Sequence, residues 1–245
     1  MDIFFEIHKD LPREGPGESA STHRALGLLR PHLPAEPLIL DIGCGPGLQT
    51  LDLARYTNGK ILAIDTHPPF LSELEKRARA ASLTGRITTA NESMFSLPFP
   101  PASFDLLWSE GAIYILGFAE GLRAWKPLLK PGGCLGVTEI SWLKANPPKK
   151  VAAYWGREYP GMRSVDENLV RAQQAGYRLI DHFTLPASAW WENYYTPIEA
   201  RLPALDEKYR GDAEAEAMLA ATREEIAFYR EFSEWYGYVF YLMQV

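Results

Sequence analysis

The segment Leu38–Gly47 constrains the fold of this chain more than any other. A short apolar run leads into a turn where Gly43, Gly45 and Gly47 alternate with other residues, and a helical pattern, Leu48–Tyr56, follows directly. Glycine adopts backbone angles that other residues resist, and the first turn of a helix leaves N–H groups free. The segment therefore predicts a buried strand, a helix, and a nucleotide-binding crevice at the carboxyl end of the strand.

The spacing of the glycines distinguishes between the nucleotides that such a crevice binds. The dinucleotide fingerprint is Gly-x-Gly-x-x-Gly, whereas here the third glycine is Gly47 and the fingerprint position holds Leu48. The carboxylate of Asp41, at the end of the strand, would repel a pyrophosphate and would attract a cation. S-adenosylmethionine carries a sulfonium and an ammonium and has no phosphate. An NAD-dependent dehydrogenase remains as an alternative, which the spacing and Asp41 disfavour.

The pattern Asp-x-Gly-x-Gly-x-Gly closely resembles motif I of the class I methyltransferases. The resemblance covers residues 37 to about 142. A Leu-Pro-Phe segment (97–99) and a Phe-Asp pair (104–105) are most similar to the branch that includes ubiquinone and menaquinone C-methyltransferases. The resemblance implies that S-adenosylmethionine is the cofactor and S-adenosylhomocysteine the product. It also implies that the cofactor contacts Asp41, Gly43, Cys44, Gly45, Gly47 and Ser109.

Short apolar runs alternate with helical patterns along the chain, which is typical of a parallel sheet wrapped by helices. We expect an α/β, Rossmann-like fold with a seven-stranded, mostly parallel sheet flanked by helices, the last strand being antiparallel. A helical cap is expected between strands six and seven, within one domain (1–245). The expected strands are 37–42, 60–65, 86–90, 104–109, 134–142, 177–185 and 238–245. The expected parts are an N-terminal helical lid (1–36), a cofactor-binding core (37–185), the cap (186–236) and the final strand (237–245).

Asp65 closes the second expected strand and lies 18 residues after Gly47. A carboxylate at this place in a nucleotide fold accepts hydrogen bonds from both ribose hydroxyls, and Thr66 follows it in the same turn. The alternative for Asp65 is a plain turn or helix-capping residue. Its place one strand–helix unit after the glycine loop favours ribose binding.

The adenine end of the site is predicted from the resemblance. Relatives carry an acidic residue and then a small or apolar one shortly before the Leu-Pro-Phe segment, and here Ser93 and Met94 occupy those positions. Serine is a weaker acceptor than a carboxylate, and Asn91 or Glu92 would substitute if the loop is shifted. The alternative for Met94 is an ordinary core methionine.

The fourth expected strand leads into Glu110, the best-placed candidate for catalysis. Methyl transfer is an in-line displacement at a sulfonium, so the enzyme mostly supplies proximity and alignment, with a base where the nucleophile needs one. Glu110 is interpreted either as that base or as a ligand for the cofactor ammonium, and both readings stay open. His8 is an alternative base and His67 a further one, although each would ordinarily be a solvated surface residue.

Aromatic residues are the candidates for binding the methyl acceptor. Tyr114 follows the fourth strand, and four aromatic residues gather at the start of the expected cap. Such rings form an apolar or cation-binding wall, or they pack the cap onto the sheet. The loop Pro12–Gly17 is interpreted as a lid over the cofactor because of its glycines. The four cap residues are Trp190, Trp191, Tyr194 and Tyr195.

Composition narrows the partners. A formal net charge of −6 gives no general attraction to nucleic acid or anionic lipid. Two cysteines, Cys44 and Cys134, form no disulfide framework and no metal spacing, so we expect no metal. The sequence has no run of about 18 apolar residues and its first residues lack signal-peptide features, so we expect a cytoplasmic protein without a membrane span. The oligomeric state stays open.

The expected function is S-adenosylmethionine-dependent methyl transfer to an O, N or C atom of a small, partly apolar molecule. An alternative is a methyltransferase fold that keeps the cofactor as a structural or sensory ligand without turnover.

Overall fold

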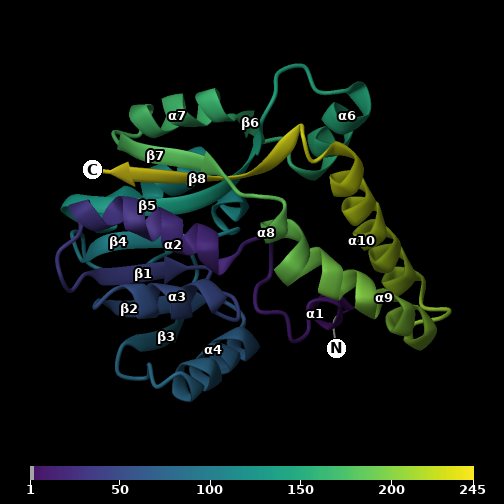
Figure 1. The fold of residues 1–245 in the computed structure, drawn as a ribbon, viewed down its shortest axis with the longest axis horizontal. Coiled ribbons are helices and arrows are strands. Elements are labelled where there is room, and N and C mark those ends of the chain that lie inside the picture. Colours follow the sequence, from purple (N-terminus) through teal and green to yellow (C-terminus); the bar gives the residue numbers. More distant parts are fainter. Residues whose placement is uncertain (1–2) are drawn as a thin grey trace.

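A mixed sheet forms the centre of the protein, whose computed structural model describes residues 3–245 (Figure 1). Seven strands are hydrogen-bonded in the order β3-β2-β1-β4-β5-β8-β7, and a two-residue strand, β6, pairs with the end of β5. The strands are β1 (Leu38–Ile42), β2 (Lys60–Asp65), β3 (Ile87–Asn91), β4 (Phe104–Ser109), β5 (Leu129–Trp142), β6 (Arg163–Ser164), β7 (Arg178–Thr184) and β8 (Tyr236–Gln244).

The strand directions create the crevice. Strands β1 to β6 pair in parallel, whereas β8 runs antiparallel to both of its neighbours, β5 and β7. The chain moves outward from β1 to β3 and then returns to β4 on the other side of β1. Ligands of open α/β sheets bind outside the carboxyl ends of the strands at such a reversal. The crevice therefore lies between the ends of β1 and β4.

Helices cover both faces of the sheet and stabilise it with two apolar layers. Leu29 of α2, Leu53 of α3 and Leu74 of α4 are buried on one face, and Phe118 of α5 and Ala172 of α7 on the other. The helices of the core are α2 (Ser19–Leu29), α3 (Leu48–Tyr56), α4 (Pro68–Ala80), α5 (Phe118–Trp125) and α7 (Val165–Gln174), whereas α6 (Lys149–Glu158) packs under the cap. Short 3₁₀ turns are η1 (Arg30–His32), η2 (Ile113–Ile115) and η3 (Lys126–Leu128).

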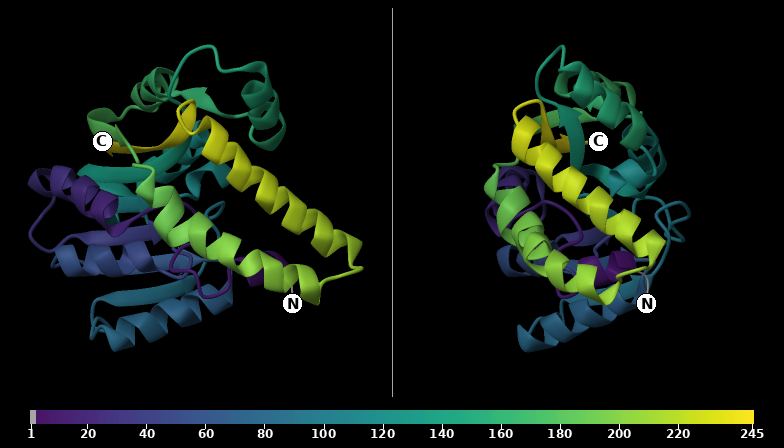
Figure 2. Two further views of the ribbon diagram at one scale, coloured as in Figure 1. Left: turned by 45° about the vertical axis from the view of Figure 1, so that its right-hand side comes forward. Right: turned by 90° about the vertical axis from the view of Figure 1, so that its right-hand side faces the viewer.

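The cap is inserted between β7 and β8 and lies beyond the carboxyl ends of the parallel strands (Figure 1). Figure 2 shows α9 and α10 as two long arms that project from this edge of the sheet. The N-terminal helix α1 (Ile3–Ile7) packs against both arms. The cap consists of α8 (Ser188–Trp190), a π-helical turn η4 (Trp191–Tyr195), α9 (Thr196–Lys208) and α10 (Ala213–Phe232).

The expected Rossmann-like fold, its antiparallel last strand and the helical cap are confirmed, with one correction to the strand count. The sheet has eight strands, because β6 adds a two-residue parallel pairing to β5 that is too short to leave a pattern in the sequence. Strand β5 begins at Leu129 and not at Cys134. The pairing of β5 with β4 shifts in register between Phe104 and Leu106, and this irregularity accommodates the Pro-Gly-Gly segment within the strand. No described helix is long and apolar enough to cross a membrane.

Three hydrogen bonds join residues 17–18 to the beginning of the cap. The N–H of Gly17 donates to the carbonyl of Ala189 at 2.8 Å, and Asn193 Nδ2 donates to the carbonyl of Gly17 at 3.2 Å. Ser188 Oγ donates to Glu18 Oε2 at 2.7 Å. Residues 17–18 and 188–193 are thus held together although about 170 positions separate them in the chain.

Candidate active site

The glycine loop has a backbone conformation that favours glycine at each of its three positions. Gly43, Gly45 and Gly47 have φ angles of 72°, 52° and 86°, in the left-handed region. The N–H of Gly43 donates to the carbonyl of Ile64 at 2.9 Å, which fixes the loop to the end of β2. The loop therefore presents bare backbone to the crevice between β1 and β4.

A cavity of about 320 Å³ opens at this crevice. Its wall combines the glycine loop, the end of β2, the turn after β3, the turn after β4 and the N-terminal segment. Seven of the ten residues expected to bind the cofactor line it: Gly43, Cys44, Gly45, Asp65, Thr66, Ser93 and Met94.

Asp41 lies directly beneath the loop and outside the lining of the cavity. It is fully buried and accepts hydrogen bonds from Thr50 Oγ1 at 2.6 Å and from Gln49 Nε2 at 3.4 Å. Burial raises the pKa of Asp41 to about 7. Its Oδ1 has no hydrogen-bond partner among the described residues, so one acceptor remains for a donor that enters from the cavity side.

Gly47 and Ser109 support the crevice from behind. A Cβ atom at Gly47 would lie 2.3 Å from Cδ1 of Leu74, so this glycine permits the close packing of the loop on α4. Ser109 is fully buried and its Oγ donates to the carbonyl of Ile42 at 2.9 Å, which joins β4 to β1. This geometry gives both residues a packing role outside the lining of the cavity, and the direct cofactor contact expected from the sequence stays a prediction.

The carboxylate of Asp65 is oriented by two backbone N–H groups. Oδ2 accepts from Gly45 at 2.9 Å and Oδ1 accepts from His67 at 2.9 Å. Each oxygen keeps further acceptor capacity toward the cavity. The arrangement suits the two hydroxyls of a ribose.

The turn after β3 supplies the opposite end of the cavity. Ser93 Oγ accepts from the N–H of Phe95 at 3.3 Å, and the carbonyl of Met94 accepts from Trp125 Nε1 at 3.3 Å. Glu92 also lines the cavity, whereas Asn91, its other expected substitute, ends β3 and does not. The ring of Phe95 is 63% exposed at this end, which leaves an apolar surface for a planar base.

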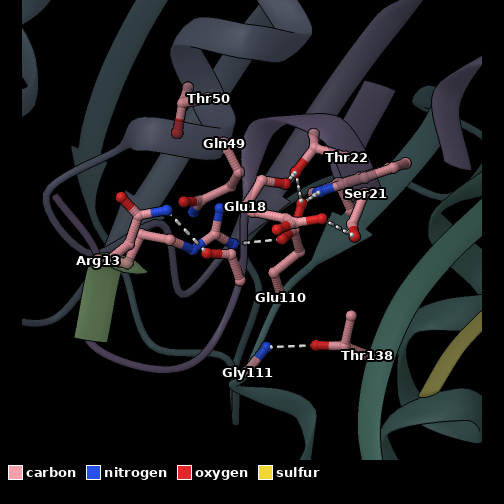
Figure 3. A network of polar contacts seen from close by, with 12 residues as sticks. Arg13, Glu18, Ser21, Thr22, Gln49, Thr50, Glu110, Gly111 and Thr138 are labelled. Carbon is pink, nitrogen blue, oxygen red and sulfur yellow. Dashed lines mark hydrogen bonds and ion pairs between the residues drawn. The ribbon is translucent and has the colours of Figure 1, made fainter. Parts of the chain in front are cut away.

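Glu110 is the centre of a buried polar network (Figure 3). Its Oε1 accepts from Thr22 Oγ1 at 2.7 Å and from Trp108 Nε1 at 2.9 Å, and its Oε2 forms an ion pair with Arg13. Three donors already occupy the carboxylate, so this geometry disfavours Glu110 as a general base. The ion pair holds Arg13, which lines the cavity, in place.

The N-terminal loop forms part of the cavity wall through Arg13, Glu14 and Gly15. Arg77 of α4 donates to the carbonyl groups of Pro12 at 3.3 Å and Pro46 at 3.2 Å, so it joins this loop to the glycine loop. Burial and the neighbouring charge of Asp65 raise the pKa of Glu14 to about 8.

We expect the unliganded protein to lose stability as the pH rises from about 5 to about 8. The pKa values of Asp41, Glu14 and Glu139 are raised to about 7, 8 and 8. When the pKa of a carboxyl group is higher in the folded than in the unfolded protein, its protonated form favours folding. The contribution of these groups to the free energy of unfolding is therefore complete below about pH 4 and is lost as the pH rises through their folded-state pKa values. Urea unfolding at several pH values would measure this. Glu14→Gln should weaken the dependence, whereas Glu120→Gln, at an exposed site, should not; equal slopes in all three proteins would contradict the assignment.

Comparison with known proteins agrees with this geometry. A family model described as a methyltransferase domain matches residues 39–133. The chain is 28% identical to 24-methylenesterol C-methyltransferase 2 of Oryza sativa subsp. japonica, over 76% of this chain and 54% of that protein. It is 33% identical to dimethylglycine N-methyltransferase of Parasynechococcus marenigrum, over 49% of this chain and 42% of that protein. The chain thus spans about half the length of the curated relatives it matches.

A solved structure extends the comparison to the whole fold. An S-adenosylmethionine-dependent methyltransferase from Geobacter sulfurreducens, in complex with S-adenosyl-L-homocysteine, superposes with a TM-score of 0.83 at 20% identity. The match covers 99% of this chain and 97% of that one. Residues 39–133 thus match a methyltransferase domain, and the whole chain shares the fold of that S-adenosylmethionine-dependent methyltransferase. The cap and the N-terminal segment, which lie outside the residues matched by the family model, are part of this shared fold.

The two candidate histidines differ in position. His8 lines a second cavity under the cap, not the cofactor cavity. Its Nδ1 is bonded to the carbonyl of Phe4 at 2.9 Å, its Nε2 lies 3.3 Å from Tyr194 Oη, and burial lowers its pKa. His67 lines the cofactor cavity and stacks on Phe5 with ring centroids 3.9 Å apart. The structure favours a packing role for His8 over a base at the cofactor.

The aromatic residues of the cap divide into two groups. Trp190 is 3% exposed and stacks on Tyr229 at 4.1 Å, and the ring of Trp191 lies against Arg230 at 4.8 Å. These two tryptophans pack the cap. Tyr194 and Tyr195 line the cavity under the cap, and Tyr114 lines the cofactor cavity, so the tyrosines remain candidates for contact with the acceptor.

Several lining residues were not predicted from the sequence. Gln49 and Phe70 follow the glycine loop and the end of β2, and Phe5 comes from α1. Arg13 and Glu14 belong to the loop interpreted as a lid, but no motif singled them out. The signal that could have identified Arg13 and Glu14 is their position in a loop rich in Gly and Pro. Most other charged residues of the chain belong to helical patterns with an exposed face.

Proposed function

We propose that this protein binds S-adenosylmethionine and transfers its methyl group to an O, N or C atom of a small, partly apolar molecule, releasing S-adenosylhomocysteine. The observation that carries the proposal is the 320 Å³ cavity at the carboxyl ends of β1 and β4, where the glycine loop, Asp65 and unsatisfied charged groups meet. Its volume and its mixed wall suit one nucleoside with a charged tail.

The unsatisfied groups match the charges of the proposed cofactor. Arg13 Nη1, Glu14 Oε2 and Asp41 Oδ1 are buried without hydrogen-bond partners among the described residues. A buried polar or charged atom without a partner is costly. The methionine end of S-adenosylmethionine carries a carboxylate and an ammonium, so it offers an acceptor to the arginine and donors to the carboxyl groups. Binding would relieve this cost.

The residues have distinct parts in the proposed reaction. Asp65 would hold the ribose hydroxyls, and Ser93 with Met94 would hold the adenine. Glu110 would keep Arg13 aimed at the methionine carboxylate. The sulfonium supplies an activated methyl group, and the chain's residues supply proximity, alignment and exclusion of water.

The relatives support small-molecule methylation. The curated relatives are named for a sterol and for dimethylglycine, and the Geobacter sulfurreducens structure holds S-adenosyl-L-homocysteine. Net charge −6 supports the absence of a nucleic-acid partner. The two cysteines, Cys44 and Cys134, are free and buried, which supports a reducing, cytoplasmic location.

Titration with S-adenosylhomocysteine tests the proposal. Calorimetry and thermal shift should detect binding of S-adenosylhomocysteine and no binding of NAD, because the glycine spacing and Asp41 oppose a pyrophosphate. Binding of NAD alone would favour a dehydrogenase. Tight binding of S-adenosylmethionine without turnover across amine, hydroxyl and carbon acceptors would favour a non-catalytic binding module.

A further inference from the structure

A second cavity, of about 370 Å³, lies under the cap between α1, α6, η4, α9 and α10. Phe4 lines both this cavity and the cofactor cavity, so the two adjoin. His8 and Tyr194 line the cap cavity next to Phe4, and the ring centroids of Phe4 and His8 are 4.3 Å apart. A molecule in the cap cavity would therefore be a neighbour of whatever fills the cofactor cavity.

Aromatic rings form much of the wall of the cap cavity. Tyr154, Tyr194 and Tyr195 contribute their rings from α6 and η4, and Ile198 adds an aliphatic side chain. Tyr154 is held by stacking on Phe228 with ring centroids 4.2 Å apart. The faces of tyrosine rings carry negative partial charge and attract cations as well as apolar groups.

The charges of this cavity are predominantly negative. Among the described residues that line it, Arg157 is the only arginine or lysine, and it is engaged by Glu158 at 2.6 Å and lies 3.9 Å from Glu224. Glu225 forms no ion pair with a described residue and accepts one hydrogen bond, from Tyr195 Oη at 2.8 Å. This half-buried carboxyl group therefore has no counter-ion among the described residues.

The charge of Glu225 also reaches the cofactor cavity. Tyr114 lines that cavity, and its pKa is raised by burial and further by the negative charges of Glu225 and Glu139. Tyr114 and Tyr159 have ring centroids 6.0 Å apart, and Tyr159 Oη donates to Glu139 at 2.8 Å. Tyr114, Tyr159 and Glu139 thus form one series of contacts that begins at the cofactor cavity.

We propose that the cap cavity binds the methyl acceptor and selects a molecule that carries a protonated or quaternary amine, with Glu225 as its counter-ion and the tyrosine rings around it. This inference rests on the proposed methyltransferase function and names its substrate class. A cation would supply the missing partner of Glu225, and its alkyl groups would contact Tyr154, Tyr194 and Ile198. A neutral or anionic acceptor would leave that carboxyl group unpaired.

Competing probes test the selection directly. Choline and its uncharged isostere 3,3-dimethylbutan-1-ol have the same shape around the branched end and differ in charge. Each would be titrated, by calorimetry and by tryptophan fluorescence, into protein saturated with S-adenosylhomocysteine. We expect choline to bind at least about tenfold more tightly, a difference of about 1.4 kcal/mol. Glu225→Gln should remove this preference, and Glu231→Gln, at an exposed site of the same helix, should keep it.

The outcomes separate this inference from the proposed function. Equal affinity for the two probes, no binding of choline while S-adenosylhomocysteine binds, or an unchanged preference in Glu225→Gln would overturn the amine selection. Failure to bind S-adenosylhomocysteine would instead overturn the proposed function. The comparison of the two probes uses the unmodified protein, so it decides the question even if Glu225→Gln does not fold.

Discussion

Arg13→Ala should lower the free energy of unfolding by about 3–5 kcal/mol, the range seen when one partner of a buried ion pair is removed. The side chains of Arg13 and Glu110 are 4% and 1% exposed. Without the guanidinium, Glu110 would keep only Thr22 and Trp108 as donors for a carboxylate that has no access to water. Urea unfolding followed by circular dichroism would measure the change.

Two further variants show whether the pairing is the cause. The double variant Arg13→Ala/Glu110→Gln should recover part of the loss, because a neutral amide costs less to bury than an unpaired carboxylate. Arg123→Ala removes an arginine from an ion pair with Glu120 on the surface of α5, where the two side chains are 62% and 56% exposed, and should cost less than about 1 kcal/mol. An Arg13→Ala loss as small as that of Arg123→Ala would refute the structural role of the network.

Asp65→Ala should weaken binding of S-adenosylhomocysteine by about 100-fold or more. Two ribose hydrogen bonds to a charged acceptor would be lost, each worth about 1.5–3 kcal/mol before relaxation. The substitution also removes the acceptors of the Gly45 and His67 N–H groups, so the loop would lose part of its preorganisation. Calorimetric titration of both proteins gives the ratio of dissociation constants.

A control separates the loss of ribose contacts from general destabilisation. Asp206→Ala, on the exposed side of α9, should leave the affinity unchanged. Asp65→Asn should bind S-adenosylhomocysteine with an affinity between those of the unmodified protein and Asp65→Ala. Its amide keeps one acceptor oxygen, but its NH2 group would face a backbone N–H, which is also a donor. Unaltered affinity in Asp65→Ala would mean that the ribose lies elsewhere.

The sequence predicted the central sheet well, because its signals are local. The run Leu38–Ile42, the glycines and the helix that follows specify one another over a few residues, and the structure places β1 and α3 at almost the expected bounds. Motif spacing also placed Asp65 correctly at the end of β2, facing the cavity. Local patterns do not show which residues lie behind the wall of the cavity. The sequence therefore predicted that Gly47 and Ser109 contact the cofactor, although neither residue lines the cavity.

The long-range parts of the site could not be predicted. Arg13 meets Glu110 across 97 positions of the chain, and nothing near either residue specifies the other. Helix α6 was missed because its amphipathic pattern, Lys149–Glu158, is short and packs under the cap instead of on the sheet. The tyrosines and tryptophans of the cap lie in one aromatic stretch of the sequence. Only their packing in the structure shows that Trp190 is a core residue and that Tyr194 lines a cavity.

The hydrogen bonds between residues 17–18 and 188–193 have a kinetic consequence. Residues 17–18 follow the loop that lines the cofactor cavity, and residues 188–193 precede the two tyrosines that line the cap cavity. A displacement that uncovers either cavity would therefore strain the same three hydrogen bonds. One movement of these segments would then open both cavities together.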